Sequence, residues 1–130
     1  MMEEKVIATA ARAAHEVLRV FEREALGDNT LLPWHNAPEW QREATLAGVR
    51  ALADHEAMDA RACHRAWMMA KLEEGWVWSR EKNPMTRTHP GLIDFDDLPN
   101  PERAKDEIFV LVARVVLTLM NSTTASTRAM

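Results

Sequence analysis

The sequence predicts a mainly α-helical protein with four principal helices and a short β segment or irregular ribbon. Apolar residues recur every three or four positions through four long segments, which is the period of an amphipathic helix. Gly and Pro separate those segments, and only residues 76–80 alternate with the period of two that a strand requires. With 130 residues the chain is long enough to bury one core, so we expect one compact unit.

The first helix is expected over residues 3–25, which contain no Gly or Pro and carry an alanine-rich apolar stripe. Gly27 ends this helix, and the indole of Trp34 is expected to anchor the following loop by packing into the core. The second helix is expected over about residues 38–53, because Pro38 suits a first helical turn. Its inward stripe is expected to consist of Trp40, Ala44, Ala47 and Ala51, widened by Leu46, Val49 and Leu52.

The third helix is expected over about residues 60–74, with Asp59 as its N-cap and Gly75 directly after its end. Its core stripe is expected to comprise Cys63, Ala66, Trp67 and Ala70. The strand-like stretch follows Gly75, and its period of two predicts that Trp76 and Trp78 share a face.

The last helix is expected over about residues 100–120. Its inward face is expected to carry Ile108, Leu111, Val112, Val115 and Leu119. Its other positions are also largely apolar, so it needs cover on more than one side, and a homodimer seam would supply that cover. The apolar run is interrupted by Arg114 and is shorter than the roughly 20 residues of a membrane span, so we expect no membrane insertion. Residues 121–130, rich in Ser and Thr, are expected to form a disordered tail.

Three potential metal ligands, His55, Asp59 and Cys63, are spaced by four residues and would align on an unbroken helix. Asp59 is better explained as a helix N-cap, which breaks the alignment, so no metal site is expected. The single cysteine excludes an intramolecular disulfide, and we interpret it as a small buried side chain. His15 is interpreted as a packed or surface histidine, because a histidine acts in a mechanism only beside a placed partner.

The charge balance gives no reason to expect bulk nucleic-acid binding, since the net charge is −4. Residues 1–4 are acidic and lead into an amphipathic segment, unlike a secretory signal. The lone cysteine also fits a reducing compartment. We therefore expect a cytoplasmic location.

Aromatic and cationic residues are concentrated between the third helix and the start of the last one. His64, Trp67 and Lys71 lie on nearly one line of the third helix, since seven residues of about 100° each return close to the start. Aromatic rings stack on bases and cations bind phosphate, so this composition predicts a pocket for a flat or anionic ligand. The candidate ligand-binding residues are Lys71, Trp76, Trp78, Lys82, Arg87, His89, Arg103 and Lys105. The alternative is that the tryptophans belong to the core, His89 lies in a turn and the cations are solvated.

The segment from about Cys63 to Leu117 resembles the RyR domain, the small repeat named after ryanodine receptors and also found in bacterial and phage proteins. The resemblance is carried by His64-x-x-Trp67, Lys71, Gly75-Trp76-x-Trp78, Lys82, Asn83-Pro84, Arg87-x-His89-Pro90, Phe95, Leu98-Pro99 and Arg103-x-Lys105-Asp106. The sequence departs from the family pattern in that Trp78 and Phe95 replace Tyr, Ser79 replaces Gly, Asn83 replaces Asp and Arg87 replaces Lys. The chain has no tyrosine, so a ligand contact made through those hydroxyls is not open to it.

The resemblance implies a RyR-like, mainly helical domain over residues 59–120. Residues 1–58 would be an N-terminal helical extension of the kind seen on small phage-encoded members. The resemblance also implies recognition rather than catalysis, because nucleotide binding is associated with this type of module and prokaryotic relatives have been suggested to sense nucleotide-derived signals. In the channels the repeats occur in pseudo-symmetric pairs, so two copies of this chain would reconstruct a pair. A phage-encoded member would act in the host cytoplasm.

Three functions are therefore expected as alternatives. The first is non-catalytic binding of a nucleotide-like or other anionic ligand by the aromatic and basic pocket. The second is a structural or interaction role, as a homodimer or on another partner, through the apolar last helix, for which Val116→Asp is a test. The third is a phage-type counter-defence protein that sequesters a nucleotide signal. An enzyme and a cofactor are not expected, because the sequence has no Gly-rich phosphate loop, no GxSxG motif and no paired histidines.

Overall fold

The computed structural model describes the backbone of residues 3–129 and the side chains of residues 3–121. The elements in chain order are α1 (Glu4–Leu26), η1 (Trp34–Asn36), α2 (Glu39–Asp54), α3 (Ala60–Glu73), β1 (Val77–Trp78), β2 (Thr88–His89), η2 (Phe95–Asp97) and α4 (Asn100–Ala129). Four helices and one two-stranded segment confirm the predicted mainly α fold. None of the helices in the described part of the chain has the length and apolarity to cross a bilayer.

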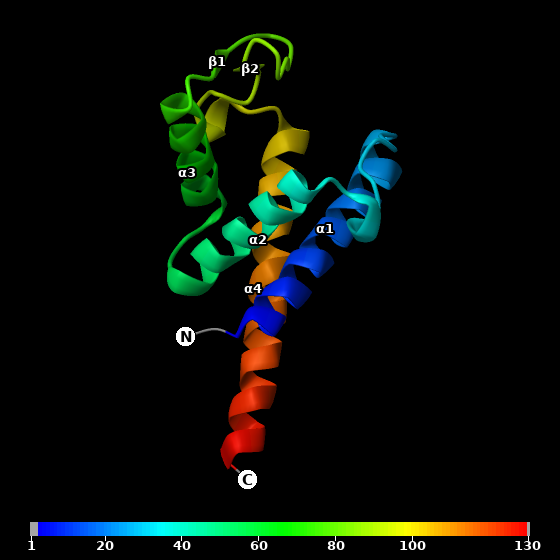
Figure 1. Ribbon diagram of the computed structural model, residues 1–130, viewed down its shortest axis with the longest axis vertical. Coiled ribbons are helices and arrows are strands. Elements are labelled where there is room, and N and C mark those ends of the chain that lie inside the picture. The colour runs from blue at the N-terminus through cyan, green and yellow to red at the C-terminus, as the bar shows by residue number, and fades with distance from the viewer. Residues whose placement is uncertain (1–2, 130) are drawn as a thin grey trace.

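Helix α4 forms the long axis of the molecule, and the other helices are arranged around its first half (Figure 1). α1 and α2 cross it on one side, while α3 and the strands lie toward its N-terminal end. The main core joins α1, α2 and α4 through Val6, Ile7, Ala10, Ala11, Val49, Leu52, Ala113 and Leu117. The alanines let the helices approach closely, because they place almost no side chain between the backbones. A second, smaller cluster of Ala60, Phe95 and Leu98 attaches η2 to the start of α3.

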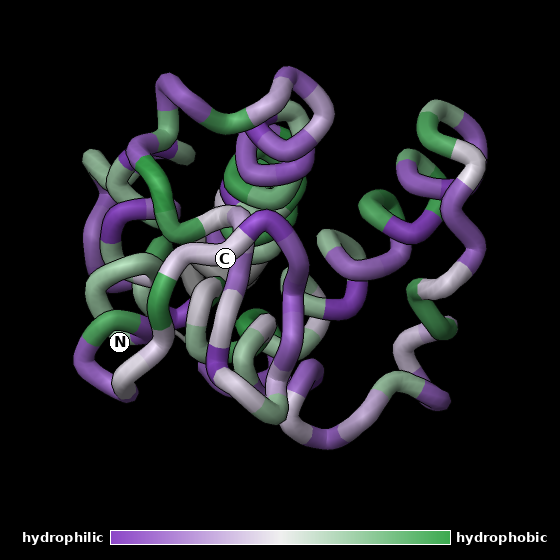
Figure 2. The backbone as a smooth tube through the Cα atoms, turned by 90° about the horizontal axis from the view of Figure 1, so that it is seen from above, coloured by the Kyte–Doolittle hydropathy of each residue, from purple (hydrophilic) through white to green (hydrophobic). Residues whose placement is uncertain are grey.

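The helices show the amphipathic pattern expected from their sequences, with hydrophobic and hydrophilic residues alternating along the tube in Figure 2. The loop after α1 is anchored as predicted by Trp34, which packs against the main core. The Trp34 ring also meets the imidazole of His15 edge-on, with ring centroids 5.4 Å apart. His15 is buried, and its Nε2 lies 2.7 Å from the carbonyl oxygen of Leu32 and donates to it. His15 is therefore a packed structural histidine, as we expected.

The inward face of α2 confirms our prediction for Val49 and Leu52 but not for the stripe that begins at Trp40. Val49 and Leu52 are fully buried, but Trp40 is 64% exposed, and Ala44 and Ala47 face solvent. The helix is thus rotated so that its branched aliphatic residues, rather than the stripe that begins at Trp40, meet the core. The physical reason is that this helix carries apolar residues over much of its circumference, and burying Val and Leu removes more apolar area from water than burying Ala.

The inward face of α4 also differs from our prediction. Ala113 and Leu117 are buried, whereas Leu111 is 64%, Val115 47% and Leu119 62% exposed. Close packing of α1 selects the small Ala113 for the contact and leaves the larger side chains outside. The predicted end of the helix near residue 120 is wrong as well, because the backbone continues as helix to Ala129 in place of the disordered tail that we expected. Residues 121–129 contain no Gly or Pro to stop the helix, and Met130 lies outside the described residues.

Arg114 connects α4 to the end of α2 and to the turn that leads into α3. Its guanidinium donates to the carbonyl oxygens of Leu52 at 2.6 Å, His55 at 2.7 Å and Met58 at 2.9 Å. Carbonyls at the end of a helix have no partner within the helix and carry a partial negative charge, which a cation offsets. The one charge that interrupts the apolar run of α4 therefore serves as a helix cap.

The predicted break between α2 and α3 is confirmed. His55 is the C-cap residue of α2, and α3 begins with Asp59 as its N-cap, whose Oδ1 accepts from the Ala62 amide at 2.9 Å. His55, Asp59 and Cys63 consequently do not share one helix face. At the other end of α3, Gly75 adopts a φ of 89°, which is the left-handed conformation that favours glycine after a helix.

Candidate aromatic and basic site

Helix α3 presents one line of side chains to the rest of the molecule. Ala60 and His64 are buried, and Trp67 and Lys71 are half-buried, so the inward line runs through these four residues. The alignment of His64, Trp67 and Lys71 was predicted from their spacing. Of the separately predicted core stripe, Cys63 and Trp67 are half-buried, but Ala66 and Ala70 are exposed, so that part of the prediction is wrong. The larger aromatic residues occupy the inward face of the helix because they bury more apolar area than alanine does.

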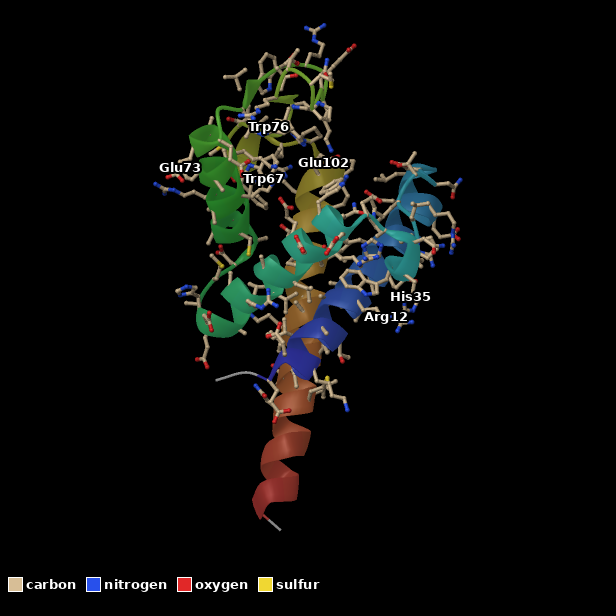
Figure 3. All side chains as sticks on the ribbon, viewed as in Figure 1. Arg12, His35, Trp67, Glu73, Trp76 and Glu102 are labelled. Atoms are coloured by element: carbon tan, nitrogen blue, oxygen red, sulfur yellow. The ribbon has the colours of Figure 1, made fainter. Side chains whose placement is uncertain are left out.

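These residues begin a continuous series of ring contacts, which we call the aromatic ladder: Phe95, His64, Trp67, His89 and Trp76. The centroid distances along it are 6.1 Å for Phe95–His64, 5.6 Å for His64–Trp67, 4.9 Å for Trp67–His89 and 6.5 Å for Trp76–His89. The last two contacts are edge-to-face, the geometry that aromatic quadrupoles favour. The ladder therefore starts against η2 inside the fold and ends near the surface beside β1. Figure 3 shows Trp67 and Trp76 at this end of the molecule, with Glu102 on the first turns of α4 across from them.

The outer end of the ladder carries the cation that we expected there. The ammonium nitrogen of Lys71 lies 4.7 Å from the centroid of the Trp76 ring, which is a cation–π distance. Trp76 is half-buried, and Trp78 is 54% exposed. The two tryptophans thus differ in role: Trp76 belongs partly to the ladder, while much of the Trp78 indole is open to solvent.

His89 is held in one tautomer by a neighbouring glycine. Its Nδ1 accepts a hydrogen bond from the Gly91 amide at 2.8 Å, so in the neutral ring the proton is on Nε2. Partial burial lowers the pKa of His89 below its ordinary value, the ammonium of Lys82 lowers it further, and the carboxylate of Glu102 opposes them. A Cβ at Gly91 would lie 3.0 Å from two His89 ring atoms, so a residue larger than glycine would require this imidazole to shift. His89 is therefore a neutral hydrogen-bonding group beside the two tryptophans near neutral pH.

Strands β1 and β2 place these groups side by side. They pair in parallel, with Val77 opposite Thr88 and Trp78 opposite His89. The connecting loop is closed by a bridge between Asn83 and Thr88. Trp78 and His89, eleven positions apart in sequence, are therefore neighbours across the ribbon.

The five predicted cations make different kinds of contact in the structure. Lys71 and Lys82 stand near the outer end of the ladder, since both influence the pKa of His89. Arg87 lies at the same end, but its Nη1 donates to the Glu74 carbonyl at 2.6 Å and so caps α3. Its backbone has a positive φ of 56°, which is uncommon for a residue other than glycine.

Arg103 and Lys105 belong to other contacts. Arg103 donates to the Asp96 carbonyl at 3.0 Å and to the Asn100 side chain, which attaches α4 to η2. Lys105 pairs with Glu22 of α1 at 3.3 Å and with Glu102 at 3.0 Å. Burial alone would lower the pKa of Lys105, but these two carboxylates raise it above its ordinary value. The structure thus brings six of the eight candidates to one end of the molecule and uses Arg103 and Lys105 to join helices.

Asp106 is a residue near the ladder that our sequence reasoning did not select as part of the site. Its Oδ2 lies 3.6 Å from Nδ1 of the buried His64, whose Nε2 donates to the Ile93 carbonyl at 2.7 Å. Burial raises the pKa of Asp106 to about 6, although the nearby His64 ring acts in the opposite direction. The signal for this pair was present in the sequence, because both residues belong to the set that carries the family resemblance.

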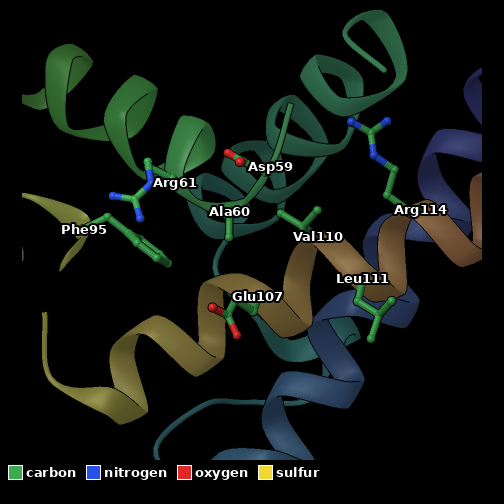
Figure 4. A pocket seen from close by; sticks show the side chains of 8 residues that line it. All are labelled: Asp59, Ala60, Arg61, Phe95, Glu107, Val110, Leu111 and Arg114. Atoms are coloured by element: carbon green, nitrogen blue, oxygen red, sulfur yellow. The ribbon is translucent and has the colours of Figure 1, made fainter. Parts of the chain in front are cut away.

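Two adjacent hollows of about 420 Å³ each open on another side of the ladder, around Arg61, Phe95 and Glu107. Figure 4 shows the more apolar of the two, with Phe95 and Arg61 from one side facing Val110 and Leu111 of α4. Arg61 forms a two-point ion pair with Asp96 at 2.7 and 2.8 Å and lies over the Phe95 ring. Of the eight candidate residues only Arg103 lines either hollow. Six of the expected ligand residues thus lie beside the ribbon and line neither hollow, whereas Arg103 lines one of them.

The exposed groups at the ribbon can make non-covalent contacts with a ligand. Among the described residues, no group of three His, Cys, Asp or Glu side chains is arranged to hold a metal ion. Burial raises the pKa of the Cys63 thiol, which leaves it a poor nucleophile. The exposed indole of Trp78, the imidazole of His89 and the ammonium groups of Lys71 and Lys82 can stack, donate a hydrogen bond and attract an anion.

Residues 49–123 match a family model described as the RyR domain, which covers more than half of the chain. The matched region begins within α2, includes α3, the ribbon and η2, and ends within α4. Every residue of the aromatic ladder lies inside it.

Proposed function

This chain belongs to the RyR domain family, and we propose that it is a non-catalytic recognition module that binds a nucleotide-like, anionic ligand at the β1–β2 ribbon. The observation that carries the proposal is the exposed indole of Trp78 beside His89, at the end of a ladder that terminates in Lys71 over Trp76. An exposed tryptophan loses solvent-accessible apolar area when a flat ring stacks on it. The site residues in this proposal are Lys71, Trp76, Trp78, Lys82, Arg87 and His89.

The electrostatics of the ribbon favour an anion in a restricted position. Lys71 also lies 3.8 Å from Glu74, and the carboxylate of Glu102 is close enough to His89 to raise its pKa, so carboxylates border the site. Lys82 forms no ion pair within the described residues and is exposed, so its ammonium is available to a phosphate. A ligand with its base on Trp78 and its phosphate toward Lys82 would avoid both glutamates.

The neutral His89 adds specificity to this arrangement. Its Nδ1 is already occupied by the Gly91 amide, so Nε2 carries the proton that a ligand oxygen can accept. The ladder behind it holds the imidazole in place through Trp67 at 4.9 Å. The protein thus offers a stacking surface, one hydrogen-bond donor and the ammonium groups of Lys71 and Lys82, which together are sufficient to bind an anionic ligand.

The proposal is tested by calorimetric titration of the purified chain with mono-, di-, tri- and cyclic nucleotides of adenine and guanine. Replacing Trp78 with alanine should lower the affinity of the best ligand by about 5- to 150-fold, since stacking on an aromatic contributes about 1–3 kcal/mol. The matched control is Trp40→Ala, because Trp40 is 64% exposed on α2 and lies outside the proposed site. Lys82→Met should weaken binding and reduce its dependence on salt.

Two further readouts distinguish recognition from the alternatives. Chromatography of the ligand after incubation should recover it unchanged, whereas turnover would contradict a non-catalytic role. A very slow dissociation rate would assign the protein to sequestration of a nucleotide signal. If no nucleotide binds or raises the melting temperature, or if Trp78→Ala and Lys82→Met bind like the wild type, the ribbon is not a nucleotide site.

A further inference from the structure

Helix α4 carries an exposed apolar stripe on the side away from the core. We define the α4 stripe as Leu111, Val115 and Leu119, which are 64%, 47% and 62% exposed. The three residues are four positions apart, so they form one ridge along the helix. Three large aliphatic side chains in one row on the surface are a typical mark of a protein contact.

The exposed positions of α4 from residue 108 to residue 120 are uncharged, and Glu107 lies immediately before this stretch. The exposed positions of α4 between residues 108 and 120 are Leu111, Val115, Thr118 and Leu119. The charge within this stretch, Arg114, is turned toward the carbonyls at the end of α2. The stripe itself therefore offers a partner three aliphatic side chains and no charge, so an apolar surface fits it better than a strongly charged one.

From this geometry we infer that the α4 stripe is the contact surface for a second copy of the same chain, in an antiparallel pair of α4 helices crossing at Val115. The stripe is symmetric about Val115, with a leucine four positions before it and another four positions after it. A twofold axis through Val115 therefore places Leu111 against Leu119 of the second copy, and Leu119 against Leu111. Ridges of residues four apart interlock at a crossing angle of about −50°.

The charges on α4 favour the antiparallel over the parallel arrangement. Glu107 is exposed and lies eight positions before Val115. In a parallel pair the two Glu107 carboxylates would face each other across the axis. In an antiparallel pair they lie at opposite ends, separated by sixteen residues or about 24 Å, well beyond the screening length of about 8 Å at physiological salt.

The shape of the molecule leaves room for this contact. The second half of α4 projects beyond the other helices (Figure 1), so this half is open to the approach of a second chain. The more apolar of the two hollows beside Phe95 begins next to Leu111, as Figure 4 shows, so the projecting end of the second α4 points toward an open apolar surface. The contact is small compared with the roughly 1,200–2,000 Å² of a typical stable interface, so we expect a dimer of micromolar affinity.

The first test is sedimentation velocity over protein concentrations from about 5 to 500 µM. The wild type should shift from monomer to dimer over this range, and added salt should not weaken the dimer. Val115→Asp should remain monomeric, because it brings two carboxylates together at the axis. The matched control is Leu72→Asp on α3, since Leu72 is also 47% exposed, and it should dimerise like the wild type. Val116→Asp is unsuitable, because Val116 packs against the main core and its loss would unfold the chain.

The second test is oxidative cross-linking. Val115→Cys should form a disulfide-linked dimer, because the axis places this position opposite itself, while Cys63 is half-buried and less reactive. Leu119→Cys faces its own copy only in a parallel pair and should not cross-link. A chain that stays monomeric at the highest concentration, a Val115→Asp variant that still dimerises, or efficient Leu119→Cys cross-linking would each overturn the proposal. Trp78→Ala should leave the dimer unchanged, so failure of the ribbon proposal and failure of this one are distinguishable.

Discussion

Replacing Arg114 with methionine should remove the charged cap that joins α4 to the end of α2. The guanidinium makes three hydrogen bonds to main-chain carbonyls, at 2.6, 2.7 and 2.9 Å. Each hydrogen bond to a charged donor contributes about 1.5–3 kcal/mol, and bonds that share one group are not additive. Methionine retains the apolar stem, so the variant isolates the loss of the donors. We expect the free energy of unfolding to fall by about 3–5 kcal/mol.

The assay is urea unfolding followed by tryptophan fluorescence and circular dichroism. The midpoint should fall while the slope with denaturant stays constant, because the surface exposed on unfolding is unchanged. Arg114→Lys should recover part of the loss, since one ammonium cannot reach all three carbonyls. Arg65→Met provides the control on the exposed surface of α3 and should change stability by less than about 0.5 kcal/mol. A loss below about 1 kcal/mol for Arg114→Met would refute the assignment of this arginine as a stabilising cap.

Two further predictions concern the ladder. Burial raises the pKa of Asp106 to about 6 from an ordinary value of 3.8, so the folded chain binds this proton more tightly than the unfolded chain. The proton therefore stabilises the fold. This stabilisation is complete below about pH 4 and is lost as the pH rises through 6. Asp106→Asn lacks this loss, so its stability relative to the wild type should increase between pH 4 and 7, and a difference that does not change with pH would contradict the reasoning. Gly91→Ala places a Cβ 3.0 Å from the His89 ring, so the free energy of unfolding measured in urea should fall by about 1–3 kcal/mol, and nucleotide binding should weaken. A variant as stable as the wild type would show that the ring shifts without strain.

The helices and their ends followed from local features of the sequence. Asp59 caps α3 and Gly75 follows it in the left-handed conformation, because both effects depend only on neighbouring residues. The alignment of His64, Trp67 and Lys71 was also predictable, since helical geometry alone places residues three and four apart on one face. The family resemblance located the ribbon and the ladder in the same part of the chain as the matched residues 49–123.

The tertiary structure decided which faces of α2 and α4 are buried and which cations remain available. Both helices are apolar around much of their circumference, so their periodicity allows several rotations, and the close approach of α1 selected Ala113 over Leu111. An arginine near one end of the fold cannot be assigned as a cap from sequence, because the carbonyl that it reaches belongs to a distant segment. Arg114 reaches Leu52 and Lys105 reaches Glu22 only after the helices have packed. Local sequence therefore specifies the elements, whereas the packing of those elements determines which charges are satisfied within the fold and which remain exposed.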